Sequence, residues 1–281
     1  MVNINGKIVK KEDASLSILN RGFNYGDAVF ETIKVSDSKI LFWEDHYFRL
    51  MASMRILRME IPMNFTLEFL EQQILDLLKD DENAFINARV KFIVYRNSDG
   101  LYLPDNNDVA YAISTKSLSR NLYEKQVEDY VVDLYKDHYI SSNLLSTLKT
   151  NNRIINVTGS IFAKENELDN CFLLNDHKHV VEALNANVFL VKGNIIKTPP
   201  ITDGCIKGVM RKQIIDIVKA MTDFVFEESS ISPFELQQAD EIFLTNVIIG
   251  IQPVTRYRKK AFNNIVAADL LSKLNGKVSS F

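Results

Sequence analysis

Hydrophobic and polar residues follow two different periods along the first part of the chain. "VNINGKIV" and "AVFETIKVSDSKILF" each hold two β-prone runs around a polar turn, Asn5-Gly6 in the first case, and predict two hairpins. "EDHYFRLMASMRILRM" and "TLEFLEQQILDLLK" place apolar residues at helical spacing and predict two helices, the second capped by Thr66. "ARVKFIVYR" and "DVAYAIST" predict strands. Residues 1–115 are therefore expected to form a small α/β domain of α+β pattern.

The second part of the chain is richer in strands. A polar segment, 116–121, is interpreted as the interdomain linker. We expect a strand over 127–135, a helix from about residue 151, and strands at "NCFLLN", "NVFLVKGNIIKT" and "DEIFLTN". "GVMRKQIIDIVKAM" and "NNIVAADLLSKLN" predict helices. Few tight βαβ units occur, so residues 122–281 are expected to form a larger, barrel-like domain rather than a nucleotide-binding sheet.

Composition narrows the class of protein. The 281 residues are 46% hydrophobic with a net charge of −3, which is typical of a globular protein and disfavours a nucleic-acid partner. No apolar run resembles a signal peptide or a membrane span, so a cytoplasmic protein is expected. Cys171 and Cys205 are interpreted as reduced structural thiols, and the pair His177 and His179 lacks the further ligands that a metal site needs.

Lys149, in "TLKTNNRIINV", has two interpretations. Taken alone, it is a solvent-exposed surface lysine. In an enclosed pocket, its amine could instead form a Schiff base, for which pyridoxal phosphate (PLP) is the usual electron sink. Such a cofactor needs an anion site for its phosphate and a partner for its pyridine nitrogen.

Candidates for both sites occur in the sequence. Gly208 precedes a predicted helix, so the amides of Val209 and Met210 could face an anion with the helix dipole behind them. Arg49 could hold a phosphate through its guanidinium, or could make an ordinary ion pair. Glu182 could keep a pyridine nitrogen protonated, or could be a surface residue at a strand end.

Six motifs in order along nearly the whole chain resemble one family. They are "NRGFNYGDAVFETIKV", "HYFRL", "LKTNN", "VVEALNANVFLV", "TPPITDGCIKGVMR" and "DEIFLTNVIIGIQPV". Together they resemble the class IV aminotransferases, the fold type IV PLP enzymes, which include branched-chain and D-amino-acid aminotransferases and aminodeoxychorismate lyases. The resemblance implies two α/β domains with PLP in the cleft between them, and a homodimer.

The resemblance also implies roles for individual residues. Lys149 would form the Schiff base and move the α-proton of the substrate, and Glu182 would pair with the pyridine nitrogen. Asn187 would be a polar neighbour of the cofactor. The phosphate would be held by a set of residues from several motifs: Arg49, Gly208, Val209, Met210 and Thr245.

The activity stays open between three alternatives. Arg153, four residues after the lysine, resembles the lyases, which release pyruvate to give 4-aminobenzoate. Leu101 stands where those lyases carry an arginine, and the apolar "GLYLP" favours a hydrophobic, branched-chain-type amino acid that passes its amino group to a 2-oxo acid. A PLP-binding relative without activity is a third alternative. The substrate-side candidates are Tyr25, Tyr95, Arg96, Tyr102 and Asn246.

Overall fold

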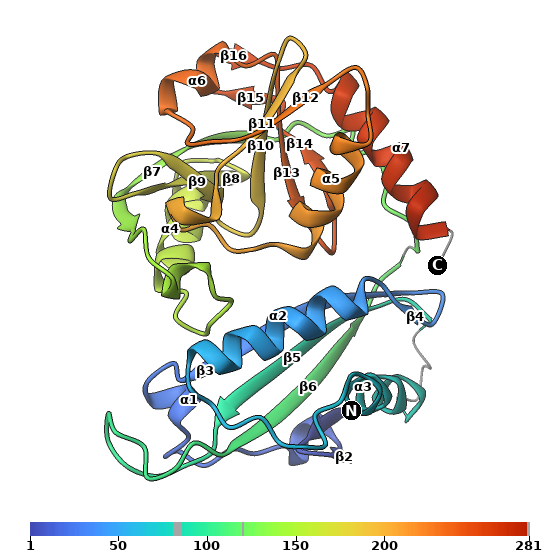
Figure 1. The fold of residues 1–281 in the computed structure, drawn as a ribbon, viewed down its shortest axis with the longest axis vertical. Coiled ribbons are helices and arrows are strands. Elements are labelled where there is room, and N and C mark those ends of the chain that lie inside the picture. Colours follow the sequence, from blue (N-terminus) through green and yellow to red (C-terminus); the bar gives the residue numbers. More distant parts are fainter. Residues whose placement is uncertain (81–85, 120, 280–281) are drawn as a thin grey trace. The chain divides into compact units, whose positions relative to one another are not determined.

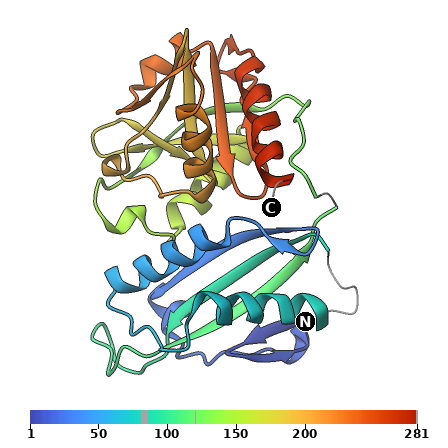
Figure 2. The same cartoon turned by 45° about the vertical axis from the view of Figure 1, so that its right-hand side comes forward.

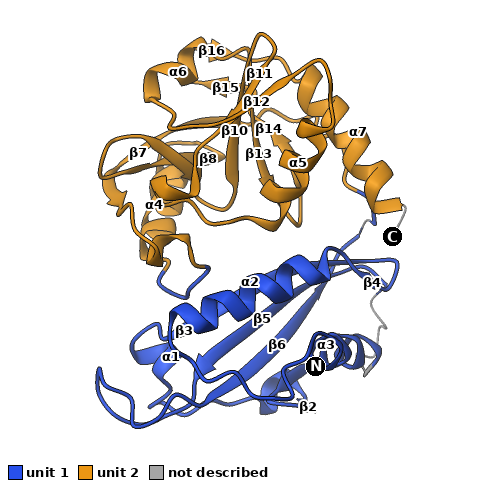
Figure 3. Cartoon of the chain, viewed as in Figure 1, with its two compact units in different colours: residues 1–122, 149–152, 281 blue, residues 123–148, 153–280 orange. Residues whose placement is uncertain are grey.

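The chain divides into two compact units. The structure is a computed structural model that describes residues 1–80, 86–119 and 121–279. Unit 1 contains residues 1–122 and 149–152, and unit 2 contains 123–148 and 153–280 (Figure 3).

Unit 1 is built on one antiparallel sheet with the strand order β2-β1-β6-β5-β3-β4. The strands are β1 (Val2–Ile4), β2 (Lys7–Val9), β3 (Ala28–Ser36), β4 (Lys39–Ile40), β5 (Ala88–Arg96) and β6 (Val109–Ser117). The turn between β1 and β2 uses positive φ at Asn5 (50°) and Gly6 (89°), as the primed hairpin turns require.

Two helices cover one face of this sheet. The helical segments of unit 1 are η1 (Lys11–Asp13), α1 (Arg21–Asn24), α2 (Trp43–Ile56) and α3 (Leu67–Asp80). The hydroxyl of Thr66 accepts a hydrogen bond from Phe69 N (3.1 Å) and caps α3, as predicted. Apolar side chains of α2 and α3 pack with Val29 and Ile33 of β3 and with Phe92 of β5 in one buried cluster (Figures 1 and 2).

Unit 2 contains two five-stranded sheets, β12-β11-β10-β13-β14 and β16-β15-β7-β8-β9. Its strands are β7 (Val131–Ile140), β8 (Asn170–Asn175), β9 (Val180–Ala183), β10 (Asn187–Lys192), β11 (Ile195–Thr198), β12 (Val225–Glu228), β13 (Glu241–Asn246), β14 (Gly250–Pro253), β15 (Arg256–Tyr257) and β16 (Lys260–Ala261). Its helices are η2 (Leu145–Thr147), α4 (Ile154–Glu165), η3 (Ile201–Asp203), α5 (Val209–Lys219), α6 (Pro233–Gln238) and α7 (Ile265–Ser279). One buried cluster joins Phe172 of one sheet with Val188 and Leu244 of the other, which gives the strand-rich, barrel-like core predicted for this part.

The predicted hairpins and long helices are present, and the differences lie at short or displaced elements. The strand expected over 127–135 begins at Val131, and the helix expected from about residue 151 begins at Ile154. The predicted linker, 116–121, overlaps the end of β6 at Ser117, and its residue 120 lies outside the described residues. The domain boundaries stay a prediction.

Candidate active site

Lys149 lies at the edge of the unit 1 sheet. Its carbonyl accepts a hydrogen bond from Phe30 N (2.8 Å), and Asn151 N donates to Ala28 O (3.0 Å), so the segment runs antiparallel to the start of β3. Residues directly opposite in such a pair share a face, and Lys149 Nζ lies 4.5 Å from the centroid of the Phe30 ring. The lysine is half-buried, and its ammonium is held on an aromatic face rather than left to solvent. Although Lys149 was expected in the C-terminal domain, its segment groups with unit 1.

A glycine allows the lysine segment to approach β3. The side chain of Asn152 donates from Nδ2 to Gly26 O (3.2 Å). A Cβ atom on Gly26 would lie 2.4 Å from Asn152 Oδ1, and the φ of Gly26 is +64°. Only glycine fits here without displacing Asn152, so Gly26 fixes the position of the segment that carries Lys149.

Arg49 is held by a buried carboxylate, Glu31. Arg49 Nε donates to Glu31 Oε1 (2.8 Å) and Arg49 Nη2 donates to Glu31 Oε2, while His46 Nδ1 lies 2.6 Å from Glu31 Oε2. Burial acts to raise the pKa of Glu31, but the charge of Arg49 and the hydrogen bonds from His46 and Arg49 outweigh it and lower this pKa to about 2. Burial lowers the pKa of His46. The ion pair that the sequence left open for Arg49 is therefore formed, and its two hydrogen bonds fix the plane of the guanidinium.

Glu182 and Asn187 fix the backbone that leads into α5. Glu182 is 3% exposed in β9, not a surface residue at a strand end, and its Oε2 accepts a hydrogen bond from Ile206 N (2.9 Å). Asn187 Nδ2 donates to Ile206 O (2.9 Å). A Cβ atom on Gly208 would lie 2.0 Å from Asn187 Oδ1, so any side chain at position 208 would collide with the side chain of Asn187. Two residues of β9 and β10 thus position the start of α5.

The start of α5 has the features of an anion site. Gly208 is the N-cap without a side-chain cap, and the first amides of a helix, here Val209 and Met210, have no partner within the helix. Thr245 of β13 pairs with Asn187 of β10 in the sheet register. The hydroxyl of Thr245 is buried and has no hydrogen-bond partner among the described residues. A buried hydroxyl of this kind is expected to have a partner, which a ligand could supply.

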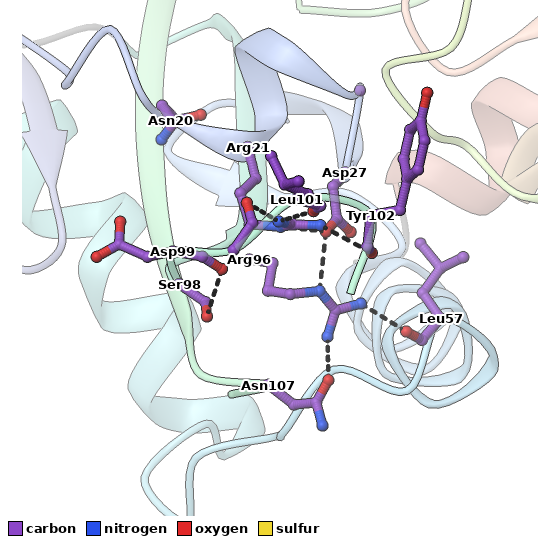
Figure 4. A network of polar contacts seen from close by, with 12 residues as sticks. Asn20, Arg21, Asp27, Leu57, Arg96, Ser98, Asp99, Leu101, Tyr102 and Asn107 are labelled. Atoms are coloured by element: carbon purple, nitrogen blue, oxygen red, sulfur yellow. Dashed lines mark hydrogen bonds and ion pairs between the residues drawn. The ribbon is translucent and has the colours of Figure 1, made fainter. Parts of the chain in front are cut away.

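The substrate-side candidate Arg96 belongs to a network that shapes the loop after β5 (Figure 4). Asp27 Oδ2 accepts from Arg96 Nε (2.8 Å) and from Arg21 Nε (3.0 Å). Arg96 also donates to Asn107 Oδ1 (2.6 Å) and Leu57 O (2.7 Å). With 6% of its surface exposed, Arg96 is engaged in structural contacts, and its part in substrate binding stays a prediction.

The other substrate-side candidates differ in exposure. Tyr102 is 90% exposed, and its ring lies 5.7 Å from that of Tyr25. Tyr95 is buried, and burial raises its pKa. Asn246 accepts from the amides of Ile248 (3.0 Å) and Ile249 (3.0 Å), so its side chain shapes the turn after β13.

The structure therefore gives two groups of predicted residues, each inside one unit. Arg49 and Lys149 belong to unit 1, whereas the second group belongs to unit 2 and comprises Glu182, Asn187, Gly208, Val209, Met210 and Thr245. Sequence reasoning missed Glu31, although a carboxylate on the apolar side of a strand pattern could have indicated a buried ion pair.

Comparisons with known proteins agree on one family. Residues 28–257 match the family described as Amino-transferase class IV. A Methanocaldococcus jannaschii protein named "Putative branched-chain-amino-acid aminotransferase" is 29% identical over 279 residues, which cover 98% of this chain and 94% of that protein. A D-alanine aminotransferase of Staphylococcus epidermidis is 26% identical, covering 91% of this chain and 88% of its own. The aminodeoxychorismate lyase of Vibrio harveyi is also 26% identical, over 84% of this chain and 85% of that protein.

Solved structures have the same fold. The branched-chain aminotransferase of Thermoproteus uzoniensis, solved with norvaline, superposes with a TM-score of 0.88 at 22% identity, over 99% of this chain and 94% of that one. The predicted fold class is confirmed by this likeness. Among the described residues, no helix is both long and apolar enough to cross a membrane.

Proposed function

Since this chain belongs to the class IV aminotransferase family, we propose that it is a PLP-dependent aminotransferase acting on a hydrophobic, branched-chain-type amino acid and a 2-oxo acid. The observation that carries the proposal is the placement of Lys149, whose amine lies 4.5 Å from the Phe30 ring at the edge of a sheet. A lysine held in this way is suited to covalent attachment of a cofactor aldehyde.

The residues of unit 2 fit the phosphate and ring of PLP. The buried Thr245 hydroxyl has no partner among the described residues, and a phosphate oxygen would supply one. The amides of Val209 and Met210 follow the N-cap Gly208 and lie at the N-terminus of α5, where the helix dipole is positive. We assign the phosphate to these groups and to Arg49, and the pyridine nitrogen to Glu182.

The chemistry is divided between cofactor and protein. When bound, PLP supplies an electron sink that stabilises negative charge at the α-carbon of the amino acid. Lys149 Nζ removes and returns the α-proton, as a positioned general base. Glu182, which is 3% exposed, keeps the ring nitrogen protonated because a buried carboxylate favours a proton or cation beside it. The hydrogen bond from Asn187 to Ile206 O fixes the backbone that leads to the amides of Val209 and Met210, to which we assign the phosphate.

The substrate assignment has support from the loop after β5. Leu101, Tyr102 and Leu103 are 78%, 90% and 83% exposed, so this loop offers apolar surface to a hydrophobic side chain. The similarity to the Methanocaldococcus relative favours the same assignment. The alternative is an aminodeoxychorismate lyase, which the Vibrio harveyi relative and Arg153 favour.

We further propose a cytoplasmic homodimer. Ile154, Val157 and Ile161 form an exposed apolar stripe along α4, with 70%, 51% and 52% of their surfaces exposed. Such a stripe is typical of a surface that is covered in an assembly. Cys171 and Cys205 are free and buried, which suits a reducing compartment.

One set of assays tests the proposal. The purified protein should be yellow, and its absorbance should change when leucine is added and recover when 2-oxoglutarate is added. Glutamate should form from leucine and 2-oxoglutarate faster than from D-alanine and 2-oxoglutarate. Formation of 4-aminobenzoate from aminodeoxychorismate without glutamate formation would select the lyase instead. A colourless protein that binds no PLP would refute both assignments.

A further inference from the structure

Tyr123 is a buried tyrosine at the start of unit 2, where the chain has just left unit 1. It is 3% exposed, and its hydroxyl donates a hydrogen bond to Val247 O (2.9 Å), 124 residues further along the chain. Burial raises the pKa of Tyr123, so the phenol keeps its proton and acts as a donor. A phenylalanine would fill the same space, so the hydroxyl serves the contact with Val247 rather than apolar burial.

Val247 lies in the turn that connects β13 and β14. Asn246 and Gly250 form the last residue pair of this hairpin, and Thr245 belongs to the pair before it. Thr245 carries the buried hydroxyl without a partner among the described residues, and Asn246 is a substrate-side candidate. The hydroxyl of Tyr123 thus fixes the backbone immediately after two residues of the candidate site.

The ring of Tyr123 holds the other side of the same turn. Gly250, the first residue of β14, has a φ of +80°, and a Cβ atom there would lie 2.7 Å from Cγ and Cδ1 of the Tyr123 ring. The backbone of Gly250 therefore approaches the ring too closely for any side chain at this position. Hydroxyl and ring together contact the turn at both ends, at Val247 after β13 and at Gly250 where β14 begins.

Tyr123 is itself fixed on α7. Tyr123 N donates to Asn275 Oδ1 (3.0 Å), and Asn275 Nδ2 donates to Tyr123 O (2.7 Å). The start of α7 is fastened to β13, because the carboxylate of Glu241 accepts hydrogen bonds from the amides of Val266 (2.9 Å) and Ala267 (3.1 Å). The helix packs against β13 and β14 (Figure 1). The turn after β13 is therefore held by a helix that is anchored on the same strand.

We propose that Tyr123 is a positioning residue, which fixes the β13–β14 turn and so holds Thr245 and Asn246 where cofactor and substrate need them. This inference rests on the proposed function, because it takes Thr245 as a phosphate ligand. Asn246 Oδ1 accepts from the amides of Ile248 and Ile249 and organises the turn from within, whereas Tyr123 ties the turn to α7. Without the hydroxyl, the turn must be ordered again when a ligand binds, and this cost lowers the affinity.

Two matched variants of the PLP-loaded enzyme separate this role from a purely structural one. Tyr123→Phe removes the hydroxyl and keeps the ring against Gly250. Tyr135→Phe is the control, because Tyr135 belongs to the same unit, is 1% exposed, and donates from its hydroxyl to Thr158 Oγ1 (3.0 Å) on α4. Each variant loses one hydrogen bond of a buried phenol, so urea unfolding should show similar losses of stability.

Two measurements then distinguish the variants. Hydrogen exchange, followed by mass spectrometry of peptides that cover residues 245–250, should be roughly 10-fold faster in Tyr123→Phe and unchanged in Tyr135→Phe. Equilibrium dialysis of the loaded enzyme should show the Kd for PLP raised about 3- to 10-fold in Tyr123→Phe and less than about twofold in Tyr135→Phe. An equal rise of Kd in the two variants, an unchanged Kd in Tyr123→Phe, or unchanged exchange in the turn would overturn the inference.

Hydrogen exchange also keeps this test apart from the proposed function. If wild type retains no PLP, the proposed function fails, and exchange in the turn alone decides on Tyr123. Faster exchange confined to Tyr123→Phe then supports the anchoring role, and unchanged exchange overturns it. If wild type retains PLP and both variants retain it equally well, the inference on Tyr123 alone fails.

Discussion

Substitution of Glu31 by glutamine tests the buried ion pair beneath Arg49. Glu31 is 1% exposed and accepts hydrogen bonds from Arg49 and from the ring of His46. Glu31→Gln keeps the size of the side chain and removes its charge, so the guanidinium of Arg49 loses the carboxylate that compensates it. Removing one partner of an enclosed ion pair costs more stability than forming the pair contributes, because the other charge, here on Arg49 with 13% of its side chain exposed, loses its compensating carboxylate.

The size of the effect follows from the pKa of Glu31. Burial acts to raise it, and Arg49 and His46 outweigh burial and lower it from 4.5 to about 2. This difference corresponds to about 3 kcal/mol of stability. Because the pKa is lower in the folded state, the contribution is complete above the unfolded value of 4.5 and is lost as pH falls toward about 2.

Urea unfolding of wild type and Glu31→Gln at a series of pH values measures this contribution. Two PLP concentrations allow the part due to ligand binding to be subtracted. We expect a loss of about 3 kcal/mol at neutral pH that shrinks as pH falls below 4.5. Asp269→Asn is the control, because its pair with Lys273 (3.4 Å) is exposed and should contribute less than about 0.5 kcal/mol. A loss no larger than that of the control, or one independent of pH, would refute the reasoning.

Two further changes probe the start of α5. Thr245→Val removes a buried hydroxyl without a partner among the described residues, so the unfolding free energy of the cofactor-free protein should not fall, while a fluorescence titration should show PLP affinity reduced about tenfold. A large loss of stability with unchanged affinity would contradict the phosphate assignment. Gly208→Ala places a Cβ 2.0 Å from Asn187 Oδ1 and should cost about 1–3 kcal/mol in urea unfolding. Gly276→Ala in α7, which meets nothing within 4 Å, should instead stabilise by about 0.5–1 kcal/mol, and equal effects of the two glycine changes would contradict the close approach.

Much of the fold could be predicted from the sequence because its long elements have a clear period. The alternation in β3 and β5 and the apolar spacing in α2 and α3 each continue over nine or more residues. Short elements carry no such signal: β15 and β16 have two residues each and depend on tertiary pairing. The segment 149–152 was expected to lead directly into a helix, but its hydrogen bonds go to β3, which no local pattern reveals.

The candidate site could be predicted in part. Motifs indicated Lys149, Arg49 and Glu182 as candidates because their residue types suit PLP chemistry, and these roles stay predictions. They did not identify Glu31, because its role depends on which face of β3 it occupies and on the residues of α2 that lie against that face.

The most direct test of the account is to locate the lysine that carries the cofactor. Borohydride reduction of the PLP-loaded protein fixes the cofactor on its amine, and peptide mass spectrometry then identifies the residue. Lys91 is the natural competitor, since its ammonium lies 5.1 Å from the same ring that Lys149 approaches to 4.5 Å. The account predicts the phosphopyridoxyl group on Lys149, and its absence from Lys149→Ala. Labelling of Lys91 in wild type, or of no lysine at all, would contradict it.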